Sequence, residues 1–119
     1  MDWNFISQFH KNPPTFQLKR EKRIQDKYNI NKSKPGYNKD LFKRLFKYDE
    51  DFVIVPNTYP YHFVDGTKHL IYWSQKPIDC SELERNINKL CKEYIYFENL
   101  AENKSIKDIY HAHIFVKNN

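Results

Sequence analysis

The chain has 119 residues, a formal net charge of +5 at pH 7 and an aromatic content of 17%. This length supports one sizeable hydrophobic core and the aromatic residues supply the bulk to fill it, so we expect a single domain over residues 1–119. Only two glycines occur, which excludes a Rossmann fingerprint and a P-loop, because both need several glycines to approach a phosphate closely.

Nothing in the sequence predicts insertion into a membrane or passage across one. No apolar run approaches the roughly 20 residues that a spanning helix needs. Residues 1–8 also lack the basic and apolar regions of a secretory signal. Cys80 and Cys91 have no CxxC spacing, and we expect both to be reduced thiols. We therefore expect a soluble protein in the cytoplasm or another intracellular compartment.

Residues 1–48 are predicted to form a basic, helical N-terminal part. Trp3, Ile6 and Phe9 recur at a spacing of three, which predicts a short helix ahead of the proline pair at residues 13–14. A second helix is predicted over residues 16–28, although its apolar positions are sparse. We expect this second helix to contribute little to the core.

A loop and a third helix are predicted next. The loop spans residues 29–36, where Ser, Lys, Pro and Gly follow one another. The helix begins with Asn38 as its N-cap, because a short polar side chain accepts hydrogen bonds from the first free backbone N–H groups. Its apolar stripe consists of Leu41, Phe42, Leu45 and Phe46. We expect this stripe to pack firmly against the core.

Positive charge is concentrated in this N-terminal part. Residues 17–47 hold eleven Lys and Arg residues against three Asp and Glu residues, a local charge of +8, so the remainder carries −3. Such a cluster binds phosphate backbones by releasing their counterions, and it is also common on a solvated helix face. The first interpretation predicts nucleic-acid contacts near the start of the cluster. The residues concerned are Lys19, Arg20, Lys22 and Arg23.

Residues 50–117 are predicted to form an α+β core. Runs of β-branched and aromatic residues predict strands at 52–55 and 68–73. Ser81 and Glu84 have the spacing of a capping box, which predicts the start of a helix there. The apolar stripe of that helix comprises Leu83, Ile87, Leu90 and Cys91.

Two further strands complete the predicted core. Residues 94–97 fit either a continuation of the helix or a strand, and their β propensity favours the strand. Residues 98–108 are polar and predict a loop, after which residues 109–116 form the last strand. The order of elements predicts an α+β fold, in which N-terminal helices precede a β-β-α-β-β unit with a four-stranded, mainly antiparallel sheet.

The last strand carries the best functional lead, a pair of histidines. His111 and His113 lie two residues apart, so their side chains point to one face at a separation of roughly 7 Å. Ala112 and Ile114 lie on the other face, which is the better candidate for the core. The histidine face should then look into a cleft or solvent, where an imidazole can act as a nucleophile, a general acid or base, or a metal ligand. The structural alternative is that the histidines merely pair across the sheet.

Other residues with chemical potential lie on the preceding strand. His69 and Trp73 share a face of that strand, and His62 lies in the connection before it. Convergence of either histidine on the pair at 111 and 113 would make a three-histidine metal site geometrically feasible. No spacing in the sequence requires this convergence, so we assign no metal ligands and no cofactor.

Six segments of the second half match a known family in their order and spacing. They are residues 55–61, 66–73, 76–77, 96–99, 104–106 and 110–115. Through these segments the chain resembles the fungal N-acetylglucosamine-induced protein family, a poorly characterised domain family. The likeness covers about residues 50–117, and the N-terminal part matches only through its helical, basic character.

The same order of motifs also resembles the histidine triad superfamily of nucleotide hydrolases and transferases. An Asn-x-x-Pro-Tyr turn, a Gly-x-x-His strand, a helix, an Asn-bearing strand, a Ser and then His-x-His follow one another. In that superfamily the last core strand carries three alternating histidines, and the middle one attacks a nucleotide α-phosphate. The resemblance places His111 first and His113 as the nucleophile, with Phe115 in the third position.

This resemblance implies a pocket for a nucleotide or a phosphorylated sugar. Its lining would be Asn57, His69, Trp73, Asn99, Ser105, His111 and His113. His113 would form a phosphoramidate and His111 would orient it. Ser105 would bind a phosphate oxygen and Asn99 a ribose or sugar hydroxyl. The phenylalanine at 115 cannot hydrogen-bond, so we expect binding first, and hydrolase or nucleotidyl transferase activity only if His113 is competent. The superfamily also allows a homodimer.

The alternative hypothesis is a non-enzymatic module that contacts nucleic acid or an acidic protein partner through its basic N-terminal helices. In that case the histidines only stabilise the sheet. The two hypotheses differ in where a ligand binds and in how steeply binding falls with salt.

Overall fold

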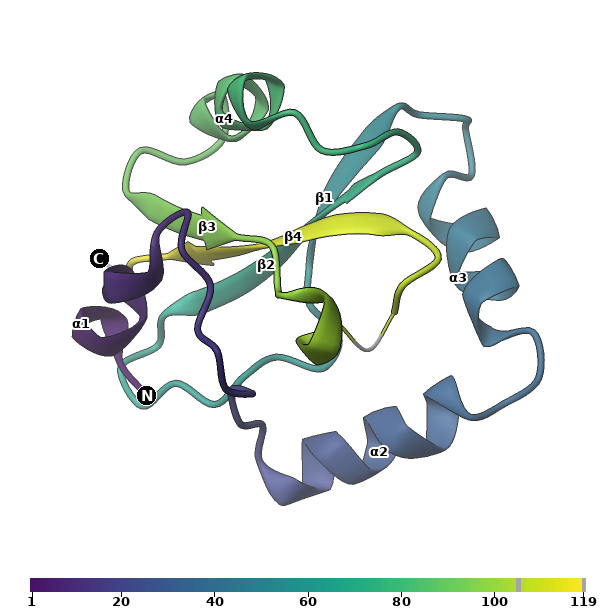
Figure 1. Cartoon of the computed structure of the whole chain (residues 1–119), viewed down its shortest axis with the longest axis horizontal. Coiled ribbons are helices and arrows are strands. Elements are labelled where there is room, and N and C mark those ends of the chain that lie inside the picture. Colours follow the sequence, from purple (N-terminus) through teal and green to yellow (C-terminus); the bar gives the residue numbers. More distant parts are fainter. Residues whose placement is uncertain (105, 119) are drawn as a thin grey trace.

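The centre of the molecule is an antiparallel sheet of four strands in the order β1-β2-β4-β3 (Figure 1). The computed structural model describes residues 1–104 and 106–118. The strands are β1 (Phe52–Pro56), β2 (Lys68–Ser74), β3 (Tyr94–Phe97) and β4 (Tyr110–Val116). The predicted α+β fold and its four-stranded sheet are confirmed, and the strand bounds agree to within a residue.

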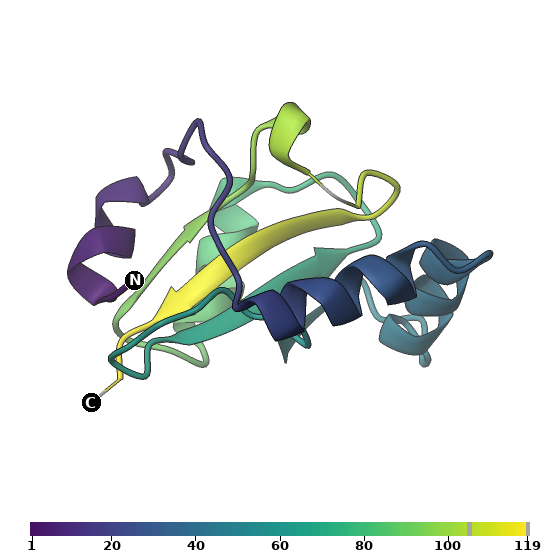
Figure 2. The ribbon, with the colours of Figure 1, turned by 90° about the horizontal axis from the view of Figure 1, so that it is seen from below.

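One face of the sheet packs against the helix α4 (Cys80–Asn88), which lies behind the sheet in Figure 2. Leu83 and Ile87 of this helix are fully buried. They form one cluster with Ala112 and Ile114 of β4, which are also fully buried. This face is therefore core, as predicted, because alternation along β4 places its small and aliphatic residues here.

The opposite face carries the histidines and is covered by the N-terminal part. The covering elements are α1 (Trp3–Ile6), the 3-10 helix η1 (Ser7–Phe9), α2 (Lys22–Lys32) and α3 (Tyr37–Leu45). Ile6 packs near the fully buried Phe115 at one end of this face, and Tyr28 and Leu41 pack near Trp73 at the other. This face was expected to look into a cleft or solvent, and the burial of His111 and His113 excludes the second of these.

The second helix differs from its predicted position. It was expected over residues 16–28, but α2 begins at Lys22 and continues to Lys32, through part of the predicted loop. The residues before it stay extended because they bond to a distant loop. The backbone N–H of His62 donates to the Lys19 carbonyl at 3.1 Å, and Arg20 Nε donates to the Tyr59 carbonyl at 2.6 Å. These long-range bonds override local helix propensity.

The starts of α3 and α4 also differ from the predictions. Gly36, with a φ of +77°, is the N-cap of α3 instead of Asn38, whose side chain donates to Asp108 at 2.8 Å. Asp79 caps α4 in place of Ser81, because its carboxylate accepts from two backbone N–H groups of the first turn. The predicted stripe residue Leu90 lies beyond the end of α4 and is exposed.

The remaining predictions concern the loop before β4, the thiols and the membrane. The loop at 98–108 contains a short 3-10 helix, η2 (Ala101–Asn103). Cys80 and Cys91 are free thiols. None of the helices in the described residues is long and apolar enough to cross a membrane.

Candidate functional site

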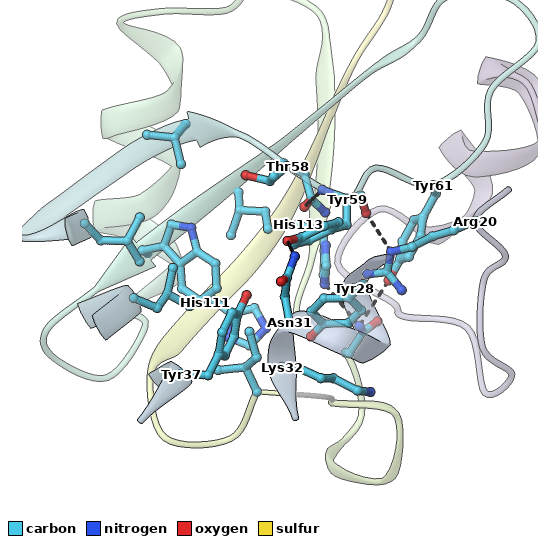
Figure 3. A pocket seen from close by; sticks show the side chains of 18 of the residues that line it. Arg20, Tyr28, Asn31, Lys32, Tyr37, Thr58, Tyr59, Tyr61, His111 and His113 are labelled. Carbon is cyan, nitrogen blue, oxygen red and sulfur yellow. Dashed lines mark hydrogen bonds between the residues drawn. The ribbon is translucent and has the colours of Figure 1, made fainter. Parts of the chain in front are cut away.

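A pocket of about 710 Å³ opens between the histidine face of the sheet and the elements α2 and α3 (Figure 3). Five of the predicted site residues line it: Asn57, Trp73, Asn99, His111 and His113. His69 does not line it, but its ring packs against that of His113. Ser105 lies outside the described residues. Tertiary structure thus brings together residues from β1, β2, β4 and the adjoining loops.

The ring of His111 is held by the backbone just before β4. Its Nδ1 lies 2.8 Å from the carbonyl oxygen of Ile109, which can only accept, so Nδ1 carries the proton. The ring also packs against Trp73, with centroids 4.9 Å apart. Burial lowers the pKa of His111, although the Ile109 carbonyl acts in the opposite direction. The imidazole is therefore neutral near pH 7, with a lone pair on Nε2.

Nε2 of His111 faces the pocket. No hydrogen bond in the described part of the chain involves this atom, and no buried side-chain nitrogen there lacks a partner. Nε2 must therefore be accessible, and the open space beside it is the pocket that His111 lines. An oriented neutral imidazole with one free nitrogen is the form that attacks an electrophile or accepts a proton.

His113 is engaged on both ring nitrogens. Nδ1 lies 2.8 Å from Nε2 of His69, and Nε2 lies 3.1 Å from the side-chain amide of Asn99. Burial, with a smaller contribution from the nearby histidines and cations, holds the pKa of His113 well below the usual histidine value. Burial has the same effect on the pKa of His69. Both rings are neutral near pH 7 and neither presents a free nitrogen.

Positive charge surrounds the pocket. Arg20, Lys32, Lys34 and Arg44 line it together with the single carboxylate of Asp40. None of these four cations forms an ion pair with a carboxylate among residues 1–104 and 106–118. Arg20 is nevertheless fixed, because it donates to the Tyr59 carbonyl and its guanidinium lies over the rings of Tyr28 and Tyr61 at 4.7 and 5.0 Å.

Aromatic rings form much of the remaining wall. They belong to Tyr28, Tyr37, Tyr59, Tyr61 and Trp73. Asn31 Nδ2 donates to the Tyr59 hydroxyl at 2.6 Å and thereby ties α2 to the loop that follows β1 (Figure 3). The sequence analysis did not assign these tyrosines to the site. Only Tyr59 and Tyr61 lie in a segment, residues 55–61, that matched the fungal family.

The chain belongs to the family described as "Protein of unknown function (DUF3605)". The sequence model of that family matches residues 2–93, which include Arg20, Asn57 and Trp73 and end before His111. This match confirms membership of an uncharacterised domain family, and it covers the N-terminal part that the expected resemblance left out. The fold is similar to the crystal structure of HTC1, with a TM-score of 0.75, 19% identity, and coverage of 99% of this chain and 85% of that one. No curated protein matches the sequence.

The four residues predicted to contact nucleic acid differ in their surroundings. Arg20 turns into the pocket, whereas Lys19, Lys22 and Arg23 are exposed. Lys22 also pairs with Asp26 at 2.8 Å. Nucleic-acid binding by these four residues stays a prediction.

The three-histidine arrangement does not form with His62. This residue is exposed and lies 3.1 Å from the Glu21 carboxylate, whereas His69 and His113 use their facing nitrogens for each other. Within the described residues no group of three His, Cys, Asp or Glu side chains is placed to hold a metal ion.

Proposed function

We propose that the pocket binds a nucleotide or a phosphorylated sugar and that His111, instead of His113, is the residue that reacts with its phosphorus atom. The observation that carries this proposal is the combination of Arg20, a fixed cation without a carboxylate partner, and the free Nε2 of His111 in the same pocket.

The cations support a phosphorylated ligand. A guanidinium binds phosphate oxygens through charge-assisted hydrogen bonds, which are stronger when the cation has no competing carboxylate. Arg20 and Lys32 lie 4.7 and 4.9 Å from the Tyr28 ring centroid, so both add positive charge around Tyr28 at the pocket. Lys34 and Arg44 add positive charge on the α3 side.

The aromatic wall supports a ligand with a flat or ring-shaped part. Bases stack on tyrosine and tryptophan rings, and sugar faces pack on them through C–H groups. The volume of about 710 Å³ lies in the range of pockets that hold compact organic ligands. A nucleotide or a phosphorylated sugar therefore matches both the charge and the shape of the pocket.

The geometry favours a different alignment with the histidine triad pattern from the one expected. With His111 as the middle position, Ile109 takes the first position and His113 the third. This choice agrees with the hydrogen bonds, because His111 has a free Nε2 whereas both nitrogens of His113 are occupied. In the reaction, Nε2 would form a bond to phosphorus while the bond to the leaving group breaks and its electron pair leaves with that group. Water would then cleave the P–N bond and regenerate the imidazole.

The test is a binding and turnover screen with a matched variant. The panel contains AMP, nucleoside phosphoramidates, dinucleoside polyphosphates, N-acetylglucosamine phosphate and its nucleotide-linked form. The two amino-sugar compounds are included because residues 55–61 and 66–73 resemble the fungal family. His111→Asn keeps a donor for the Ile109 carbonyl but has no Nε2. We expect it to bind the preferred compound within about threefold of wild type and to lose turnover and any covalent phosphorus adduct.

Two further variants complete this test. Arg20→Met should weaken binding about tenfold or more, because a charge-assisted hydrogen bond contributes about 1.5–3 kcal/mol. His62→Asn is the control, since His62 is exposed and outside the pocket. Turnover in H111N equal to that of wild type would contradict the proposal, and so would an affinity that is unchanged in Arg20→Met.

A further inference from the structure

The Tyr61 backbone, His69, His113 and Asn99 form a hydrogen-bonded chain at the wall of the pocket. The backbone N–H of Tyr61 donates to His69 Nδ1 at 3.1 Å. Nε2 of His69 lies 2.8 Å from Nδ1 of His113, and Nε2 of His113 lies 3.1 Å from the Asn99 amide. His69 and His113 are only 5% and 4% exposed, so water does not supply other partners for these atoms.

The first bond in this chain fixes the direction of all the others. A backbone N–H can only donate, so Nδ1 of His69 must accept. Because the ring is neutral, its proton lies on Nε2 and is donated to Nδ1 of His113. Nδ1 of His113 therefore accepts, and the proton of that neutral ring lies on Nε2. The opposite tautomer of His69 would carry a proton on Nδ1, which would face the backbone N–H proton of Tyr61.

The proton on His113 Nε2 determines how the Asn99 amide must be oriented. Its oxygen and nitrogen have the same shape, and only hydrogen bonds distinguish them. The structure places the Asn99 side-chain nitrogen 3.1 Å from His113 Nε2, but the atom at this position must accept. We therefore exchange the two amide atoms and assign the oxygen to this position. The Tyr61 hydroxyl lies 3.4 Å from the same atom and can donate to it as well. The amide nitrogen then occupies the other position, for which the described residues offer no partner.

We propose that the Tyr61 backbone, His69 and His113 lock Asn99 so that its NH₂ group points into the pocket that His111 also lines, as a donor to an oxygen of the ligand's phosphate. Asn99 lines the pocket, which gives the amide nitrogen its open side. This inference rests on the proposed function for the identity of the ligand, but the lock exists without any ligand. His69 and His113 are positioning residues, and Asn99 binds a phosphate oxygen instead of the sugar hydroxyl expected from the sequence.

The lock is tested on the ligand-free protein by ¹⁵N NMR of the histidine side chains near pH 7. We expect a protonated Nε2 on His69 and His113 and a protonated Nδ1 on His111. The His111 tautomer tests the Ile109 contact and not the lock, because Nε2 protonation is the commoner neutral form and would be seen on His111 if that contact were absent. A proton on Nδ1 of His113 overturns the lock.

Variants of His69 test the direction of the chain. His69→Gln retains a side-chain N–H that can reach His113 Nδ1, so the Nε2-protonated form of His113 should persist. His69→Leu removes this donor, and the single tautomer of His113 should be lost. An unchanged His113 spectrum in H69L would show that another group sets the tautomer and would overturn the lock.

Variants of Asn99 test the donor role. Asn99→Asp still accepts from His113 Nε2 but has no N–H and adds negative charge, so AMP should bind at least tenfold more weakly while the His113 tautomer is kept. Asn99→Ala should also weaken AMP binding but should keep the His113 tautomer, because the Tyr61 N–H and His69 set it. Unchanged affinity for AMP in N99D would overturn the donor assignment. If wild type binds neither AMP nor inorganic phosphate, the proposed function and the ligand half of this inference fail together, whereas the tautomers of the ligand-free protein decide the lock alone.

Discussion

Replacing Phe115 with histidine separates the two alignments with the histidine triad pattern. If His113 holds the middle position, Phe115→His restores the absent third histidine and should raise turnover. If His111 holds it, the new imidazole enters the core and only destabilises the fold. We expect the second outcome, because Phe115 is fully buried and does not line the pocket.

The cost of this substitution follows from the surroundings of the ring. Phe115 lies 4.6 Å from His69, 5.3 Å from Phe97 and 5.6 Å from Phe63, measured between ring centroids. The smaller imidazole loses about 1 kcal/mol of apolar burial. The nitrogens of His69 are already engaged, so the new polar atoms stay unpaired at a cost of about 1–3 kcal/mol. The total is about 2–4 kcal/mol, which lowers Tm by about 10 °C in a domain of this size.

Thermal unfolding and turnover on the same samples decide the question. Phe115→Leu is the matched control, because it changes volume without adding a polar atom and should cost less than about 1.5 kcal/mol. The contrast between the two variants isolates the unpaired imidazole. F115H with the stability of wild type and faster turnover would refute the assignment of His111 as the middle histidine.

Three further predictions concern stability. Asp79→Ala should cost about 1 kcal/mol and Ser81→Ala less than about 0.5 kcal/mol in chemical unfolding, because Asp79 caps α4. Gly36→Ala should cost about 1 kcal/mol through backbone strain alone, since a methyl group at this left-handed position meets no atom within 4 Å. Burial holds the pKa values of His69 and His113 well below the unfolded value, so below about pH 6.5 the unfolded chain binds more protons. Stability should be complete above that pH and fall below it by up to about 1.4 kcal/mol per pH unit for each histidine, as measured by urea unfolding at several pH values.

The strands and the cores of α3 and α4 could be predicted from the sequence because their signals are local. The strand-forming residues at 110–116 and the helical spacing of Leu83 and Ile87 are signals of this kind. The start of α2 could not be predicted this way. It depends on bonds from Lys19 and Arg20 to residues about forty positions away, which no helical period records.

The sequence predicted several of the residues that line the pocket, but not the hydrogen bonds that their side chains form. The histidine pair and Asn99 were found from order and spacing, and the structure gathers them around one pocket. Which histidine has a free nitrogen depends on the Tyr61 backbone N–H and the Ile109 carbonyl. Backbone groups are present at every residue, so their contacts leave no mark in a sequence.

Arg20 connects the two functional hypotheses that the sequence kept apart. It was assigned to the basic cluster, yet its guanidinium lies in the pocket over Tyr28 and Tyr61. Loss of binding in an Arg20 variant is therefore expected under both hypotheses. Lys19→Ala with Arg23→Ala discriminates between them, because both residues are exposed and outside the pocket. We expect this double variant to bind AMP like wild type. Its affinity for short single-stranded RNA, measured at low and high salt, should also equal that of wild type. A loss of salt-sensitive RNA binding in the double variant, with the pocket unchanged, would instead support the basic helices as the functional surface.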